Sequence, residues 1–163
     1  MNLHRLLLER YQNNNPIKVG LIGAGKFGTM FLAQVRLMTG IHLVGVADLD
    51  PERARSSCRR TGWLDEQIAP VSVDVATTSG GTCITDDAIS LIGAPGLEVL
   101  VEATGNPAAG IEHSLQAINQ GVHIVMVNVE ADVLVGPVLA ARLASECTSA
   151  APPEHACASS SNP

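Results

Sequence analysis

The sequence predicts an α/β domain with an open, doubly wound parallel sheet between two layers of helices, a three-layer αβα arrangement. First, short apolar runs of strand length alternate with segments of helical periodicity along most of the 163 residues. Second, aliphatic residues and glycine are plentiful while aromatic residues make up only 2% of the chain. This balance is typical of parallel strands buried on both faces. Third, the length suits a single domain.

A short amphipathic helix and a linker are expected to precede the domain, over residues 1–16. Four apolar residues recur there at helical spacing, and an Asn-Asn-Asn-Pro sequence then breaks the helix. Charged residues interrupt the apolar group and no small-residue cleavage site follows, so we expect no signal peptide. The four apolar residues are Leu3, Leu6, Leu7 and Tyr11.

The first two strands and helices follow a regular order. Ile17–Ile22 is an apolar run too short for a helix, which predicts the first strand. From Lys26 the apolar residues recur at helical spacing, and we expect this helix to continue as far as Gly40. Residues 41–48 predict the second strand. The next helix should begin after Asp50, which is a suitable N-cap with a proline directly behind it.

The middle of the chain is harder to interpret. Residues 61–82 mix turn residues with brief apolar pieces, and their structure is left open. A short strand is expected near Cys83, followed by a helix capped by Thr85 or Asp86. Residues 97–105 then predict a strand that ends in a glycine turn.

The last part of the domain repeats the pattern. Asn106 is the expected cap of a helix that Gly121 closes, and residues 122–129 predict the strand after it. A final helix should have Pro137 at its start. The domain is expected to span 17–144. Residues 145–163 hold no Leu, Ile, Val or aromatic residue, so we expect a disordered tail there.

Three glycines mark the turn between the first strand and its helix. Gly23 permits a sharp turn, Gly25 lets the backbone approach a diphosphate, and Gly28 allows close packing of the helix on the strand. Asp48 ends the next strand 20 residues after Gly28, where an acid binds the ribose in dinucleotide-binding domains. The pattern predicts a Rossmann-like dinucleotide site that includes Ala24, Lys26 and Phe27. The open alternatives are a purely structural glycine turn and an Asp48 that only caps a turn.

Two further loops should border this site, because the carboxyl ends of parallel strands meet at one edge of the sheet. In the first, Thr104 and Gly105 offer a hydroxyl and backbone amides; the alternative is a plain helix cap. In the second, Asn128, Glu130 and Asp132 are candidates to bind ribose, the nicotinamide amide or substrate, or else lie on an interface surface.

The choice between NAD and NADP stays open at this point. A carboxylate at Asp48 favours the two ribose hydroxyls of NAD and repels the 2′-phosphate of NADP. Four arginines of the following helix offer positive charge for that phosphate, or else form a solvated helix face. They are Arg53, Arg55, Arg59 and Arg60.

Composition argues against several other classes of function. A net charge of −6 and a pI near 5.2 disfavour nucleic-acid and anionic-membrane partners. The four cysteines show neither CxxC pairing nor histidines at ligand spacing, so no metal site is predicted and we expect reduced, structurally incidental thiols. No run approaches the length of a membrane span, and the cytoplasm is the expected location. No catalytic residue is assigned.

Several segments together resemble the N-terminal domain of bacterial NAD(P)-dependent oxidoreductases related to homoserine dehydrogenase. This group includes the 1-deoxy-D-xylulose 5-phosphate reductoisomerase-like (DRL) enzymes, often with a C-terminal SAF domain. The resemblance runs from about His4 to about Arg142. Its segments are "HRLLLER", "PIKVGLIGAGKFGTMFLAQV", "LVGVADLDPERAR", "ITDDAISLI", "VLVEATGNPAAGIEHSLQAI" and "GVHIVMVNVEADVLVGPVLA".

The resemblance implies a Rossmann domain that binds a nicotinamide cofactor, NADPH in the DRL enzymes, and homo-oligomers among full-length members. In isoprenoid-forming members it implies metal-assisted isomerisation and reduction of a sugar phosphate. Glu130 departs from the family pattern, because homoserine dehydrogenases usually have a lysine at this place. Family members also continue into a catalytic domain, which we expect to be missing from this truncated chain.

The leading hypothesis is therefore the NAD(P)(H)-binding domain of an oxidoreductase that passes a hydride to or from a small carbonyl or hydroxyl substrate, a sugar phosphate included. We expect little turnover by this chain alone, because the catalytic domain should supply the substrate site. The alternative is a non-catalytic module that binds NAD(P)H or senses its redox state and transmits this to a partner.

Overall fold

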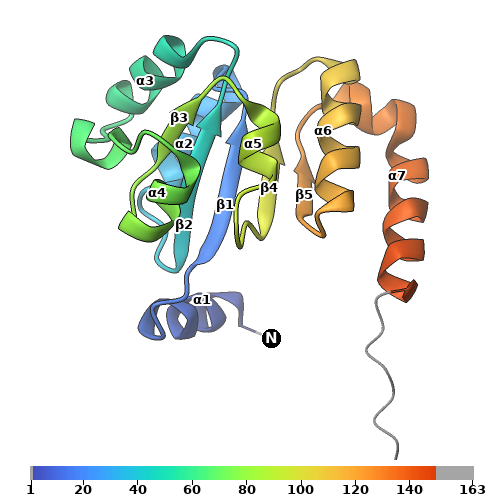
Figure 1. Ribbon diagram of the computed structural model, residues 1–163, viewed down its shortest axis with the longest axis horizontal. Coiled ribbons are helices and arrows are strands. Elements are labelled where there is room, and N and C mark those ends of the chain that lie inside the picture. Colours follow the sequence, from blue (N-terminus) through green and yellow to red (C-terminus); the bar gives the residue numbers. More distant parts are fainter. Residues whose placement is uncertain (1, 150–163) are drawn as a thin grey trace, which may run out of the picture.

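The computed structural model describes residues 2–149 and contains one five-stranded sheet, in which all neighbouring strands are parallel. The strand order is β3-β2-β1-β4-β5, so the first strand lies at the centre and the chain reverses direction across the sheet after β3. Figure 1 shows the strands side by side, with β1 in blue at the middle. The strands are β1 (Ile17–Ile22), β2 (Ile41–Ala47), β3 (Cys83–Thr85), β4 (Val99–Glu102) and β5 (His123–Met126).

Helices cover both faces of this sheet, as the sequence predicts. One face carries α2 and α3, and the other carries α4, α5 and α6, while α7 packs on α6 at the outside of the molecule (Figure 1). The helices are α1 (Leu3–Gln12), α2 (Lys26–Val35), α3 (Pro51–Arg60), α4 (Val73–Ser79), α5 (Ala88–Ile92), α6 (Pro107–Asn119) and α7 (Val129–Ser149), with a 3-10 turn, η1, at Asp65–Ile68.

Two apolar cores hold these layers together, one on each side of the sheet. The core under α2 and α3 contains Leu21, Leu32 and Trp63, whose indole Nε1 donates a hydrogen bond of 3.0 Å to the backbone oxygen of Leu32. The core under α4, α5 and α6 contains Leu91 and Leu100, both fully buried. Alternate residues of β1 and β4 enter opposite cores, which explains why the strands are continuous apolar runs.

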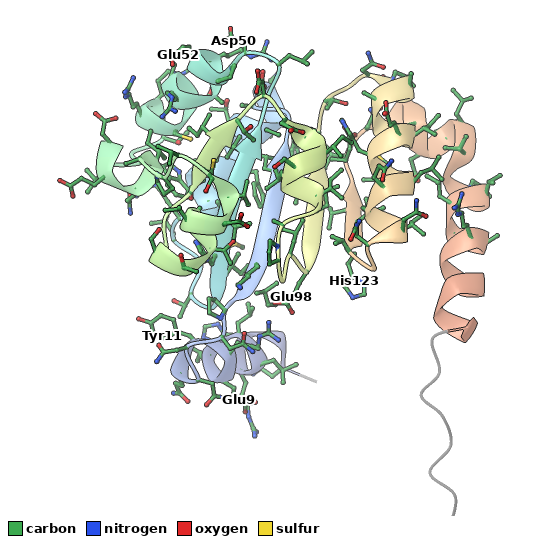
Figure 2. All side chains as sticks on the ribbon, in the orientation of Figure 1. Glu9, Tyr11, Asp50, Glu52, Glu98 and His123 are labelled. Atoms are coloured by element: carbon green, nitrogen blue, oxygen red, sulfur yellow. The ribbon has the colours of Figure 1, made fainter. Side chains whose placement is uncertain are left out.

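Helix α1 lies at the amino ends of the strands and is tied to the domain by one ion pair. Arg10 pairs with Glu98, the residue before β4, and Figure 2 shows Glu98 at the end of the sheet that faces α1. The predicted apolar stripe is only partly covered, because Leu6 is 42% and Tyr11 is 60% exposed. The helix is present as expected, but its packing on the domain is limited.

Two predicted helix limits are wrong by a few residues. Helix α2 ends at Val35 rather than near Gly40, because the amides of Leu37 and Met38 turn back to the carbonyls three residues earlier and close the helix. Helix α5 is capped by Asp87, whose carboxylate accepts from the amide of Ser90 at 2.8 Å, and not by either residue expected from the sequence.

The last helix differs most from the prediction. Pro137 lies inside α7 instead of at its start, and the helix begins at Val129, directly after Asn128. The side chain of Asn128 accepts from the amide of Ala131 and so caps the helix. The helix runs to Ser149, beyond the expected domain end at 144; the rest of the predicted tail, 150–163, lies outside the described residues.

The cysteines whose side chains are described are free and buried, as expected for structural thiols. Burial raises the pKa of Cys58 to about 11, so its thiol stays protonated near neutral pH. The side chains of the other two cysteines, Cys147 and Cys157, lie outside the described part. No helix between residues 2 and 149 is long and apolar enough to cross a membrane.

Candidate functional site

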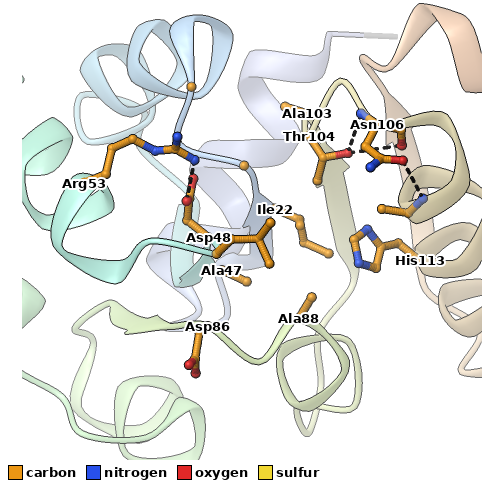
Figure 3. Close-up of a pocket in the computed structure, with 14 residues that line it drawn as sticks. Ile22, Ala47, Asp48, Arg53, Asp86, Ala88, Ala103, Thr104, Asn106 and His113 are labelled. Atoms are coloured by element: carbon orange, nitrogen blue, oxygen red, sulfur yellow. Dashed lines mark hydrogen bonds and ion pairs between the residues drawn. The ribbon is translucent and has the colours of Figure 1, made fainter.

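A pocket of about 300 Å³ lies at the carboxyl ends of the central strands. It opens between the loop after β1, the loop after β2 and the loop that joins β4 to α6, and Figure 3 shows its lining residues. This is where the chain reverses direction across the sheet, the usual place for a ligand in such folds. The lining residues are Ile22, Gly23, Gly25, Ala47, Asp48, Leu49, Arg53, Asp86, Ala88, Ala103, Thr104, Asn106, Ala109 and His113.

The three glycines of the turn differ in what a side chain at each position would meet. Gly23 has a φ of +97°, and a Cβ there would lie 2.6 Å from the backbone oxygen of Ala103. A Cβ at Gly28 would lie 2.1 Å from the backbone oxygen of Gly23, so the helix packs on the turn as closely as backbone allows. A Cβ at Gly25 would meet nothing within 4 Å. Gly25 thus leaves open space beside the pocket, where backbone is accessible to a ligand.

The start of α2 offers hydrogen-bond donors to that space. The first helical hydrogen bond of α2 is donated by the backbone amide of Thr29 to the backbone oxygen of Gly25, at a distance of 2.9 Å. Among the described residues, the four amides from Gly25 to Gly28 donate to no protein group. The positive end of the helix and these free donors together form a site suited to an anion.

Asp48 lies directly against the glycine turn. Its side chain is 1% exposed, its Oδ2 accepts from the amide of Ala24 at 2.7 Å, and its Oδ1 accepts from the amide of Asp50 at 2.9 Å. The carboxylate therefore fixes the geometry of the turn as well as lining the pocket. Asp50 caps α3 through the amide of Arg53, as predicted.

Only one of the four candidate arginines faces the pocket. Arg53 Nη2 donates to Asp48 Oδ1 at 2.6 Å, and the arginine lines the cavity. Arg55 bonds to the backbone of Ile68, and Arg59 pairs with Asp65, both away from the pocket. The helix thus directs one cation to the acid and leaves the others elsewhere.

The loop after β4 contributes polar groups to the opposite wall. Thr104 Oγ1 donates to the carboxylate of Glu102 at 2.5 Å, and Gly105 adopts a φ of +70°. Asn106 caps α6 by accepting from the amide of Ala109 at 3.2 Å. Thr104 and Asn106 line the pocket, whereas Gly105 only provides the turn between them.

The loop after β5 anchors the start of α7, and its residues are not among those that line the pocket. Asn128 is buried, and its Nδ2 donates to the backbone oxygen of Asn106 at 2.8 Å, which ties the start of α7 to the β4 loop. Glu130 and Asp132 are exposed in the first turn of α7 and do not line the pocket. Ala24, Lys26, Phe27 and Gly28, the other residues predicted at the glycine turn, are not among the residues that line the pocket.

Two polar lining residues were not predicted from the sequence. Asp86 follows β3, and its place at the carboxyl end of a parallel strand was the available signal. His113 projects from the second turn of α6 toward the pocket, between Thr104 and Ala88 (Figure 3). No local pattern marks it. Within residues 2–149, no three His, Cys, Asp or Glu side chains come together as a metal site.

The sequence model of the family described as homoserine dehydrogenase, NAD binding domain, matches residues 20–150 of the chain. The chain belongs to this family. It is an NAD-binding domain of the dehydrogenase type, and the match covers the glycine turn, the pocket and the sheet from Gly20 of β1 onward. The residues present fit such a cofactor, because the open space at Gly25 adjoins free amides and the carboxylate of Asp48.

Known proteins similar to this NAD-binding domain include homoserine dehydrogenase of Methylobacillus glycogenes, which is 29% identical over 122 residues. These cover 69% of this chain and 25% of that protein. The chain thus spans about a quarter of the length of this curated relative.

Solved structures show the same fold. The homoserine dehydrogenase of Thiobacillus denitrificans has a TM-score of 0.60 at 20% identity, over 81% of this chain and 28% of that one. The myo-inositol dehydrogenase of Lactobacillus casei, solved in complex with NAD(H) and myo-inositol, has a TM-score of 0.50 at 21% identity, over 68% of this chain and 28% of that one.

Proposed function

We propose that this domain holds NAD(P)(H) across the carboxyl ends of its strands and presents the nicotinamide for hydride transfer to or from a small carbonyl or hydroxyl substrate. The observation that carries the proposal is the row of unused amides from Gly25 to Gly28, beside open space and next to a buried acid. A diphosphate against these amides satisfies the donors and meets the positive end of α2.

The cofactor supplies the hydride chemistry, and the protein supplies binding and orientation. The glycine turn binds the diphosphate, Asp48 accepts hydrogen bonds from a ribose, and Thr104 and Asn106 border the path toward β5. Gly105 and Asn128 support this wall by shaping and anchoring the β4 loop. We assign no residue of this chain to acid or base catalysis. Efficient turnover should need substrate-binding residues from a further domain.

The cofactor preference depends on how Asp48 and Arg53 share the ribose region. In the structure Asp48 already binds Arg53, and this bond must open or rotate for a ribose to reach the carboxylate. The freed guanidinium then lies where a 2′-phosphate would be, which suits NADP, while the carboxylate suits NAD. We propose that both cofactors bind and that Arg53 lowers the discrimination against NADPH.

The finer assignment follows the sequence resemblance to the DRL enzymes. It supports NADPH as the physiological cofactor and a sugar phosphate as the substrate of the assembled enzyme, which we propose to be a cytoplasmic homo-oligomer. Glu130 supports an activity other than homoserine oxidation, because it replaces the lysine expected in homoserine dehydrogenases.

Calorimetric titration of the 163-residue protein with NADH and with NADPH tests the proposal. We expect saturable binding of one molecule of either compound and no binding of nicotinamide mononucleotide, which lacks the adenosine monophosphate half. A protein that is folded by circular dichroism yet binds neither dinucleotide would contradict the proposed function.

A further inference from the structure

A fully buried carboxylate lies behind the pocket wall. Glu102, the last residue of β4, is 0% exposed, and its Oε1 accepts from the amide of Thr104 at 3.2 Å and from the hydroxyl at 2.5 Å. Its Oε2 is enclosed without any hydrogen-bond partner. A Cβ at Gly110 would lie 3.1 Å from this oxygen, so α6 packs directly against the carboxylate.

The nearest basic group is His113, from the next turn of α6. Its Nδ1 lies 3.5 Å from Glu102 Oε1, which is ion-pair distance, but the atoms are not in hydrogen-bond geometry, and Nδ1 is also enclosed. The ring lines the pocket from α6 (Figure 3), so the other nitrogen, Nε2, is the one left for a ligand.

The Glu102 carboxyl group is charged near neutral pH. Burial alone would raise the pKa of Glu102, but the groups around it, His113, Thr104 and Asn128, outweigh burial and lower the pKa below its usual value. A buried carboxylate near neutral pH favours a cation beside it. His113 is the basic side chain in contact with it.

The pocket geometry indicates which half of the dinucleotide His113 meets. With the diphosphate on the glycine turn and a ribose at Asp48, Ala88 and His113 line the pocket across from Asp48 (Figure 3), and Ala109 is a further lining residue. Two small apolar residues and one flat polar ring suit a purine. Ala88 begins α5, which follows β3 at the edge of the sheet opposite β5. This part of the pocket therefore belongs to the adenosine half rather than the nicotinamide half.

We propose that His113, held in place by Glu102, is a binding residue for the adenosine half of the cofactor, and that its ring takes up a proton as the dinucleotide binds. This inference rests on the proposed function. The imidazolium donates from Nε2 to the ligand and adds positive charge near an anionic diphosphate. Rising pH removes that proton and weakens binding.

Other charged groups lie on the elements packed around His113. The β3–α5 loop contributes a carboxylate to the pocket, and the β2–α3 segment contributes one carboxylate paired with one guanidinium. The remaining acids lie exposed on α6 itself and on the first turn of α7, which packs against α6. These groups are Asp86; Asp48 and Arg53; Glu112; and Glu130 and Asp132.

Calorimetric titration with NADH from pH 6 to pH 9, in buffers of different ionisation enthalpy, tests the inference. For the wild type we expect uptake of up to one proton and a Kd that rises with pH, by at most about tenfold per pH unit. H113Q should bind with little proton uptake and a flat pH profile, and E102Q should reduce the uptake. H123Q is the matched control, because His123 is exposed on β5 at the opposite end of the sheet (Figure 2).

A fragment of the cofactor tests which half of the dinucleotide contacts His113. ADP-ribose should show the same pH dependence as NADH. Thermal unfolding shows whether each variant is folded. If E102Q does not fold, the test depends on H113Q alone. Wild-type binding with no pH dependence, or with one that H113Q retains, would overturn the role of His113 and leave the proposed function standing. Failure of the folded wild type to bind NADH would overturn both.

Discussion

Arg53 covers Asp48 at the rim of the pocket, with Nη2 2.6 Å from Oδ1. The arginine side chain is 57% exposed while that of the acid is 1% exposed, so the flexible partner is on the outside. The guanidinium is in contact with water, so a ligand can take its place on the buried acid when the ligand's own donors replace those of the arginine. The ribose region is thus covered by a group that a ligand can displace.

Replacing Asp48 should weaken the binding of NADH more than the binding of NADPH. In D48N the amide oxygen can still accept from the backbone amide of Ala24, but the NH2 group then faces the amide of Asp50, and the charge that favours two ribose hydroxyls is lost. We expect the Kd for NADH to rise about tenfold, since hydrogen bonds to charged groups contribute roughly 1.5–3 kcal/mol. Calorimetry with both dinucleotides measures this. D65N, at an exposed acid on η1, is the control; an equal rise for NADPH would count against the ribose role.

Removing the guanidinium should have the opposite selectivity. In R53A we expect the Kd for NADPH to rise about tenfold and the Kd for NADH to change by less than about threefold, because only NADP carries the phosphate that the cation meets. Fluorescence titration with the reduced dinucleotides checks this. R59A removes an arginine of the same helix that pairs with Asp65, and it should leave both constants unchanged.

Substitutions at two glycines of the same turn should affect cofactor binding and folding stability separately. G25A adds a methyl group that meets no protein atom within 4 Å, so the unfolding free energy should change by less than about 0.5 kcal/mol while NADH binding is lost. G28A forces a methyl group against the backbone oxygen of Gly23 and should destabilise the fold by about 1–3 kcal/mol. Urea unfolding and calorimetry on both variants give the two readouts. Normal NADH binding by G25A would exclude the diphosphate from this space.

The buried carboxylate should make stability depend on acid pH. The pKa of Glu102 is lower in the folded protein than its ordinary value of 4.5. Its contribution is therefore present in full above that value and is lost as the pH falls through the folded pKa. Urea unfolding of wild type and E102Q should show E102Q less stable at pH 7, with the difference narrowing below pH ~4.5. A difference that stays constant with pH would show that the charge of Glu102 is not stabilising.

Local patterns in the sequence predicted most of the framework. The first strand was predicted at the limits observed for β1, and Asp50 and Asn106 cap the helices expected of them. These features depend on residues within three or four positions of one another. Helix ends that have no clear sequence signal were predicted less accurately. The sequence around Pro137 predicted a start, but Asn128 caps the helix earlier, and α7 accommodates the proline in its interior.

The pairings across the pocket were not predictable in the same way. Four arginines follow Asp48, and only the rotation of α3 against the sheet decides that Arg53 faces it. Glu102 and His113 belong to a strand and a helix, and their contact depends on how closely Gly110 lets α6 approach β4. Helix rotation and approach are set by the packing of whole layers, which no short sequence pattern contains.

By itself, the sequence determined the order of strands and helices outside residues 61–82, together with the glycine turn and the acid that follows β2, because short-range periodicity and backbone freedom fix them. The tertiary structure alone decided which side chains meet in the pocket: Arg53 on Asp48, His113 beside Glu102, and Asn128 on the β4 loop. Such contacts join residues distant in the chain, and they exist only once the layers have packed.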